Sequence, residues 1–247
     1  MGFRVSGIGL PGFIITFFLY LSFPTSASAS DTGLGPSFEI GGGLMYAQSN
    51  NYPDWSTKNY RMGTINGAVR FFRGLAFQGG YDSSLGEDVH LKSLTYGDEI
   101  RLEKLGVSNY ETSWFAFRYE VPMRALKRDL FRIQTVYTSL GISWARYTLT
   151  SSQCIKNGIR EIDQSETRYH IADMRGPIAV LGARWRMDTD VTQGTGSWLG
   201  AYGIDAGVRY IRYDSYTPAH DTIEKPAGDV AVLQVFVIGF LKIRWFE

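Results

Sequence analysis

The sequence has a single cysteine, Cys154, and only three histidines among its 247 residues. One cysteine cannot close a disulfide within the chain, so a small disulfide-stapled module is excluded. Blocks of like charge are also absent, and 25 Lys and Arg residues nearly balance 24 Asp and Glu residues, which argues against a nucleic-acid-binding surface. The mean hydropathy of -0.13 is far too low for a helical membrane protein of this length.

Beyond residue 29, no window is both long and apolar at helical spacing. The chain is instead rich in glycine, with 28 residues, and aromatic residues make up 15% of it. Segments that alternate between apolar and polar residues recur, with turn-rich stretches between them, and this pattern indicates an all-β protein. Eight strands are predicted, at 38–47, 60–72, 75–85, 110–121, 130–149, 169–187, 198–213 and 230–246.

The N-terminus has the pattern of a secretory signal peptide. Arg4 precedes an apolar run at 13–23, Pro24 ends that run, and Ala27-Ser28-Ala29 supplies a cleavage site. The run is too short to span a bilayer as a helix, and no cysteine follows it that could carry a lipoprotein anchor. We therefore predict a cleaved signal peptide at 1–29 and an exported domain at 30–247. Export would leave Cys154, in a predicted loop, as an inert thiol.

The connections between the predicted strands alternate in length. Those at 73–74, 122–129 and 188–197 are short, whereas the others are long and polar. Short turns at one end and long loops at the other are typical of barrels in the bacterial outer membrane, where the long loops face outside. The predicted external loops are 48–59, 86–109, 150–168 and 214–229. Within the sixth predicted strand, Gly176-Pro177 suggests a bulge or bend, because proline cannot donate to the ladder.

Residues 89–105 leave the strand count open. Apolar residues flank Tyr96-Gly97-Asp98 there, as in a further hairpin, and a membrane-crossing hairpin would raise the count to ten. Charge favours a hairpin outside the membrane, because charged side chains are costly in lipid. The charged residues are Glu87, Asp88, Lys92, Asp98, Glu99, Arg101, Glu103 and Lys104.

One face of the predicted strands is apolar and the other carries charge. The charged face holds Glu39, Arg70, Asp82, Arg118, Glu120, Arg184, Arg186, Asp205, Arg209, Lys242 and Arg244. A soluble lipocalin-like barrel or a β-sandwich would bury all of these in its core, at a large desolvation cost. A membrane barrel avoids that cost by turning them into its lumen.

Eight strands leave an interior that side chains can just fill, so we expect these charges to pair and to stabilise the barrel. Basic residues outnumber acidic ones seven to four in the set, which leaves a bound anion as a weaker hypothesis.

No catalytic or metal-binding pattern stands out. His90, His170 and His220 lack the close spacing of metal ligands, and we predict no metal and no cofactor. Some small barrels modify lipid A with a Ser-His-acid arrangement, but no serine lies two residues along a strand from any of these histidines. His220-Asp221-Thr222 is suggestive only in composition, so no catalytic residue is predicted.

The leader, the strand rhythm and the final segment Ile243-Arg244-Trp245-Phe246-Glu247 resemble the small eight-stranded outer-membrane barrels of the OmpA transmembrane domain, OmpX and OmpW type. The resemblance covers about residues 36–246 and includes no motif unique to one family. In that class the last strand usually ends on an aromatic residue, which resembles an assembly signal, whereas here Glu247 follows Phe246. The resemblance implies an antiparallel up-and-down transmembrane β-barrel in the bacterial outer membrane. It also implies a monomer whose partners are outer-membrane lipids, lipopolysaccharide and the barrel-assembly machinery.

These observations favour a non-enzymatic outer-membrane barrel with a structural or surface-interaction role, which contacts an extracellular ligand through its long loops. Two alternatives stay open at this point. One is a narrow channel for small solutes, and the other is a lipid A-modifying enzyme.

Overall fold

The computed structural model describes residues 37–52, 56–72, 74–96, 100–122, 133–156, 159–187, 199–223, 225–226 and 228–244. The predicted signal peptide at 1–29 lies outside these residues. In the described part of the chain the regular structure is all β-strand, and no helix there has the length and apolarity to cross a membrane. The strands are β1 (Ser37–Ser49), β2 (Asn59–Phe72), β3 (Leu75–Ser84), β4 (Glu87–Tyr96), β5 (Ile100–Pro122), β6 (Ile133–Lys156), β7 (Ile159–Met187), β8 (Leu199–Tyr213), β9 (Ser215–Pro218) and β10 (Val230–Arg244).

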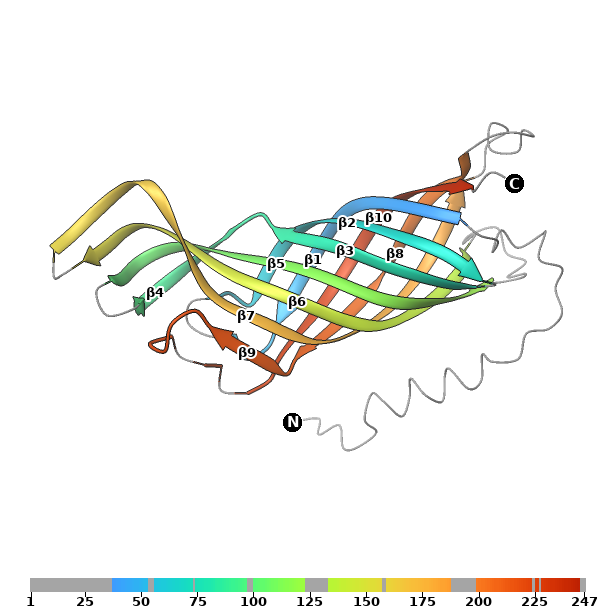
Figure 1. The fold of residues 1–247 in the computed structure, drawn as a ribbon. Helices are drawn as coiled ribbons and strands as arrows, with labels where there is room; N and C mark the ends of the chain where they lie inside the picture. Colours follow the sequence, from blue (N-terminus) through green and yellow to red (C-terminus); the bar gives the residue numbers. More distant parts are fainter. Residues whose placement is uncertain are drawn as a thin grey trace, which may run out of the picture.

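Eight of these strands close into an antiparallel barrel (Figure 1). Their order around the ring is β3-β2-β1-β10-β8-β7-β6-β5, and the pairing of β3 with β5 completes it. The first and last strands of the chain lie side by side, with Ser37 opposite Arg244. Each of the eight predicted strands overlaps one strand of this ring, so the predicted eight-stranded antiparallel barrel is confirmed.

Beyond the barrel, β4 to β7 continue as a projecting sheet (Figure 1). β4 pairs only with the first part of β5 along their ladder, and the β6–β7 ladder runs on until Lys156 pairs with Ile159. The hairpin at 89–105 therefore stays outside the barrel ring, and the ten-stranded alternative is wrong. β9 likewise pairs with β7 without joining the ring.

Two of the segments that we predicted as loops, 86–109 and 150–168, are largely strands. The first of them contains the hairpin that the sequence indicated outside the membrane at 89–105, whereas the strands within 150–168 were not predicted. A hairpin surrounded by water has no lipid-facing side, so backbone pairing continues there without strict apolar alternation. Cys154, predicted in a loop, lies in β6, with its Cα opposite Glu161.

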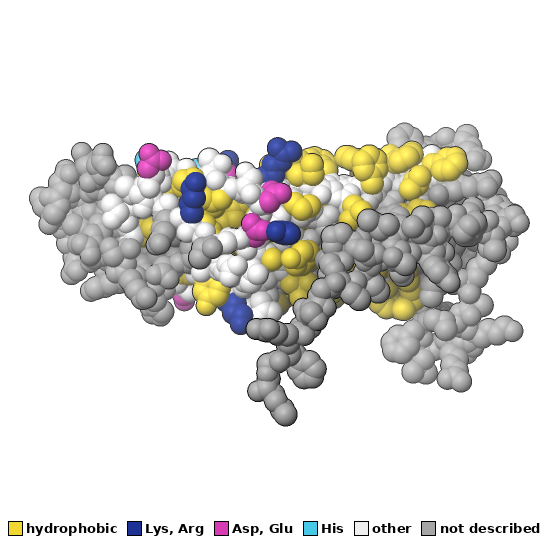
Figure 2. Space-filling view, turned by 90° about the horizontal axis from the view of Figure 1, so that it is seen from below, with side chains coloured by type: hydrophobic (Ala, Val, Ile, Leu, Met, Phe, Trp, Pro, Cys, Tyr) yellow, Lys and Arg dark blue, Asp and Glu magenta, His cyan; other side chains and the backbone are white. Residues whose placement is uncertain are grey.

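The barrel is apolar outside and polar inside. Along β1, the side chains alternate between exposed Phe38, Ile40 and Leu44 and buried Glu39 and Met45. Figure 2 shows hydrophobic side chains gathered over one half of the described surface, with most of the charged ones toward the projecting end. This inverted arrangement is that of a barrel that crosses a membrane.

Two local features follow from residue type. Gly74 closes the β2–β3 turn with a φ of 69°, a left-handed conformation that glycine adopts without steric cost. Pro177 does not form the predicted bulge, because its register with Ile142 of β6 is unbroken. It lies where β7 exchanges one partner for another, since Ile178 pairs with β8 and Arg175 pairs with β9. A residue without an N–H is tolerated at such a change of partner.

Candidate functional site

The structure places nine of the eleven predicted lumen residues inside the barrel, and none of the nine is more than 9% exposed. They are Glu39, Arg70, Asp82, Arg118, Glu120, Arg184, Asp205, Arg209 and Lys242. The other two, Arg186 and Arg244, lie in β7 and β10, but their side chains are outside the described part of the structure. Five of the nine are basic and four are acidic, so the described lumen is close to neutral.

Glu39 is the centre of the largest cluster. Its carboxylate accepts hydrogen bonds from Arg70 Nη2 at 3.0 Å and from Arg184 Nη1 and Nη2 at 2.9 and 3.0 Å, and Arg118 Nη1 lies 3.3 Å away. Glu120 pairs with Arg70 and Arg118 in the same cluster. The cluster joins β1, β2, β5 and β7, the strands on which its five members lie, and it connects residues as far apart in sequence as Glu39 and Arg184.

Two further carboxylates extend the network. Asp205 accepts two hydrogen bonds of 2.7 Å from Nε and Nη2 of Arg184, in the bidentate geometry that arginine and carboxylate favour. Asp82 accepts a hydrogen bond of 2.5 Å from Arg209 and one of 2.6 Å from the Thr64 hydroxyl. Arg209 also donates to the Gln234 side chain at 3.1 Å.

Aromatic rings cover the arginines. The guanidinium of Arg209 lies 4.2 Å from the ring centre of Trp114, and that of Arg184 lies 3.9 Å from the ring centre of Phe240. Arg118 stands 4.3 Å from the Tyr137 ring. Each cation therefore meets both a carboxylate and a π face, so little of its charge is left without compensation.

A layer of tyrosines lies between this network and the projecting sheet. Tyr60, Tyr110 and Tyr147 contact one another with ring centres 4.9 to 6.3 Å apart. The Tyr110 hydroxyl shares a 2.5 Å hydrogen bond with that of Tyr213, and the Tyr60 hydroxyl bonds Ser108 at 2.9 Å. We did not predict this layer, although Tyr110 continues the inward-facing alternation of Trp114 and Glu120 and could have been found from it.

Apolar residues close the barrel mouth beyond the tyrosines. The buried cluster reaches Val89 and Leu94 of β4, Ile171 of β7 and Ile223 beyond β9.

Elsewhere on this rim, the Arg61 side chain donates to Glu87 at 2.9 Å, and that hydrogen bond lowers the pKa of Glu87.

Little open space is left in the lumen. The cavity among the charged and aromatic side chains, bordered by Glu39, Arg118 and Trp114, has a volume of about 20 Å³. This is room for about one water molecule. The lumen at this level is filled by side chains.

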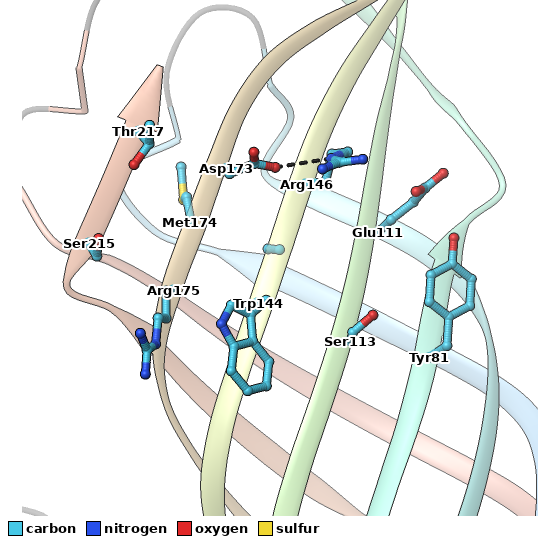
Figure 3. A pocket seen from close by; sticks show the side chains of 11 residues that line it. Tyr81, Glu111, Ser113, Trp144, Arg146, Asp173, Met174, Arg175, Ser215 and Thr217 are labelled. Carbon is cyan, nitrogen blue, oxygen red and sulfur yellow. Dashed lines mark hydrogen bonds and ion pairs between the residues drawn. The ribbon is translucent and has the colours of Figure 1, made fainter. Parts of the chain in front are cut away.

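A larger hollow of about 540 Å³ lies on the outer wall, across β3, β5, β6, β7 and β9 (Figure 3). We name it the outer groove. Tyr81, Ser113, Trp144, Arg175 and Ser215 are successive register partners across these strands and form its first row. Its second row, two residues further from the termini on each strand, is Glu111, Arg146, Asp173 and Thr217.

The outer groove combines aromatic, cationic and acidic groups. The Arg175 guanidinium lies 5.6 Å from the centre of the Trp144 ring. Arg146 Nε donates to Asp173 at 3.1 Å, and Arg168 approaches Glu111 at 3.8 Å. Among the described side chains no carboxylate forms an ion pair with Arg175. Sequence periodicity does not identify this site, because the rows are assembled across strands.

The histidines do not assemble a reactive centre. His170 Nε2 lies 3.2 Å from Asp173 Oδ1. The exposed His220 ring packs against the Tyr96 ring, with 4.4 Å between the ring centres. The His90 side chain is outside the described part of the structure. Over the residues that the structure describes, no group of three or more His, Cys, Asp or Glu side chains could hold a metal ion.

No protein-family model and no curated protein matches the chain. Solved structures do match it. Neisserial surface protein A is 10% identical, with a TM-score of 0.46, over 84% of this chain and 97% of that one. The outer membrane protein OprG of Pseudomonas aeruginosa is 13% identical, with a TM-score of 0.45, over 85% and 97%.

A further match is Ail, the attachment invasion locus protein of Yersinia pestis, in complex with the heparin analogue sucrose octasulfate. It is 13% identical, with a TM-score of 0.42, over 85% of this chain and 99% of that one. The fold itself is established by the strand pairing of this chain, in which eight antiparallel strands close into a ring.

Proposed function

We propose that the protein is a bacterial outer-membrane barrel that passes no solute through its lumen and acts at the cell surface through its projecting sheet. The observation that carries this proposal is the filled lumen. The arginine and carboxylate side chains around Glu39 come from opposite walls of the barrel and meet in its middle.

Opening a path through this network would separate several ion pairs at once. Breaking one buried pair by removing a partner costs about 3–5 kcal/mol, because it leaves a desolvated charge without compensation. Arg70, Arg118 and Arg184 share Glu39, so moving any one of them disturbs the others. A state with an open lumen is therefore expected to be rare.

The projecting sheet supports a surface role. β5, β6 and β7 extend well beyond the apolar band of the barrel, and β4 widens the sheet on the same side (Figure 1). Maintaining so much ordered β-structure in water serves no barrier function. It provides a broad surface on which an extracellular ligand could bind, while the rigid barrel anchors it.

Planar-bilayer recording tests the closed lumen. Purified, folded protein should give no reproducible unitary conductance. The double variant Glu39→Ser, Arg184→Ser removes one facing ion pair without changing net charge, and it should conduct if these side chains are the obstruction. Steady unitary currents from the unaltered protein would instead establish the narrow channel.

The proposal includes no catalysis. The motivating observation is that no histidine in the described part of the chain bonds a serine hydroxyl. Lipid A recovered from cells with and without the protein should have the same mass spectrum, and loss or gain of an acyl chain would identify a lipid A-modifying enzyme.

A further inference from the structure

The outer groove lies at the upper edge of the lipid-facing band. Toward the termini, its first row is followed by Phe115 and Ile142 and then by Phe117 and Leu140, all exposed on the same wall. Away from the termini, three of the four residues in its second row are charged, and Thr217 is the fourth. Rows two residues apart are separated by about 6.7 Å. The surface thus changes from apolar to charged within the height of a lipid headgroup.

Aromatic residues mark this level. Trp144 and Tyr81 both lie in the first row and are exposed. Tryptophan and tyrosine concentrate where the hydrocarbon core meets the headgroups, because their rings have an apolar body and a polar tip. Whatever fills the outer groove is therefore exposed to hydrocarbon on one side and to water on the other.

The polar groups of the outer groove suit a phosphorylated sugar. Arg175 is held against the Trp144 ring and, among the described side chains, pairs with no carboxylate, so its N–H groups are available to a phosphate oxygen. Ser113, Ser215 and Thr217 offer hydroxyls around it. A sugar ring can also pack its apolar face on an aromatic side chain.

The acidic residues of the outer groove favour a sugar headgroup over one that carries phosphate alone. Glu111 and Asp173 lie in the second row beside the arginines (Figure 3). Carboxylates accept hydrogen bonds from sugar hydroxyls and amides, but they repel a headgroup that presents phosphate alone. A simple anionic phospholipid therefore suits this lining less well than a glycolipid.

We propose that the outer groove binds the phosphorylated sugar headgroup of a lipid A-type glycolipid of the outer leaflet. Arg175 contacts a phosphate, Trp144 packs on a sugar ring, and the acyl chains lie along Phe115, Ile142 and the row below them. The volume of about 540 Å³ falls within the range of roughly 300–1,000 Å³ usual for ligand pockets. The proposal rests on the membrane placement proposed above but on no ligand of the projecting sheet.

Native mass spectrometry of the full-length, detergent-folded protein tests the proposal. The probes are diphosphoryl lipid A, phosphatidylglycerol and inorganic phosphate. We expect lipid A to bind most tightly. Arg175→Gln should weaken its binding roughly tenfold, because a hydrogen bond to a charged group is lost. The control is Arg61→Gln, an exposed arginine on β2 that pairs with Glu87 away from the outer groove, and it should leave lipid A binding unchanged.

Trp144→Leu keeps an apolar side chain but removes the ring, and it should weaken lipid A binding more than phosphatidylglycerol binding. Equal binding of the two lipids, equal loss in Arg61→Gln and Arg175→Gln, or phosphate binding as tight as that of lipid A would overturn the proposal. A different result would show that the protein is not a membrane protein at all. It would then stay folded and soluble without detergent. Heat-dependent gel migration shows which variants are folded.

Discussion

At the scale of single residues, the lumen is held together by shared partners. Glu39 accepts hydrogen bonds from Arg70 and Arg184 and also pairs with Arg118. Period-2 alternation placed all four of these residues on one face, because a strand has only two faces. Their pairing could not be derived in this way. Which arginine reaches which carboxylate depends on the curvature and shear of the closed ring, which bring Glu39 and Arg184 together across 145 residues.

Removing Glu120 should destabilise the barrel. Its carboxylate is 2% exposed and pairs with Arg70 and Arg118. Glu120→Ala leaves both cations undercompensated and is expected to cost about 3–5 kcal/mol, less if water enters the lumen. Folded barrels often migrate differently on gels until boiled, so the variant should show the unfolded band at a lower temperature. Val237→Leu, a change on the exposed outer face, is the control, and equal effects would contradict the inside/outside assignment.

At the scale of strands, glycines set how closely neighbours approach. A Cβ atom built on Gly141 of β6 would lie 1.8 Å from the Phe115 carbonyl oxygen of β5. The same atom built on Gly63 of β2 would meet nothing within 4 Å. Sequence periodicity predicted both strands but does not distinguish these two glycines, because the difference lies in the neighbouring strand.

Gly141→Ala should therefore force β5 and β6 apart, at a cost of about 1–3 kcal/mol. Gly63→Ala should change stability by less than about 0.5 kcal/mol. The measurement is the urea midpoint for unfolding from lipid vesicles, followed by tryptophan fluorescence. A midpoint for Gly141→Ala that matches that of Gly63→Ala would mean that the ladder absorbs the extra methyl group without strain.

At the scale of the whole molecule, the termini of the described barrel and the projecting sheet lie at opposite ends. Ser37 pairs with Arg244 at one end, together with the turn at Gly74, while β4 to β7 extend from the other. The sequence predicted this polarity from the alternation of short and long connections. It did not predict that the connection at 150–168 continues as paired strands, because pairing in water leaves little trace in hydropathy.

Labelling of intact cells tests the polarity. In a Cys154→Ser background, cysteines at exposed Asn50 and Asp221 should react with a membrane-impermeant reagent before lysis. A cysteine at position 73, between β2 and β3 in the chain, should react only after lysis, because we predict that this connection faces the periplasm. Reaction at position 73 on intact cells, with protection of the other two sites, would reverse the orientation.

The pairing of the first and last strands also governs how the protein can be made. β1 has two neighbours, β2 and β10, and the second of these is the final strand of the described chain. Closure must therefore wait until β10 has been synthesised and has reached the place where the barrel folds. The segment between β1 and β10 contains all the other strands, and so long a segment is slow to bring its ends together. Contacts between residues distant in sequence also slow folding, and they dominate the barrel. Until β10 arrives, β1 and β8 each present an open backbone edge, so a chain truncated before Val230 would be prone to aggregation and degradation.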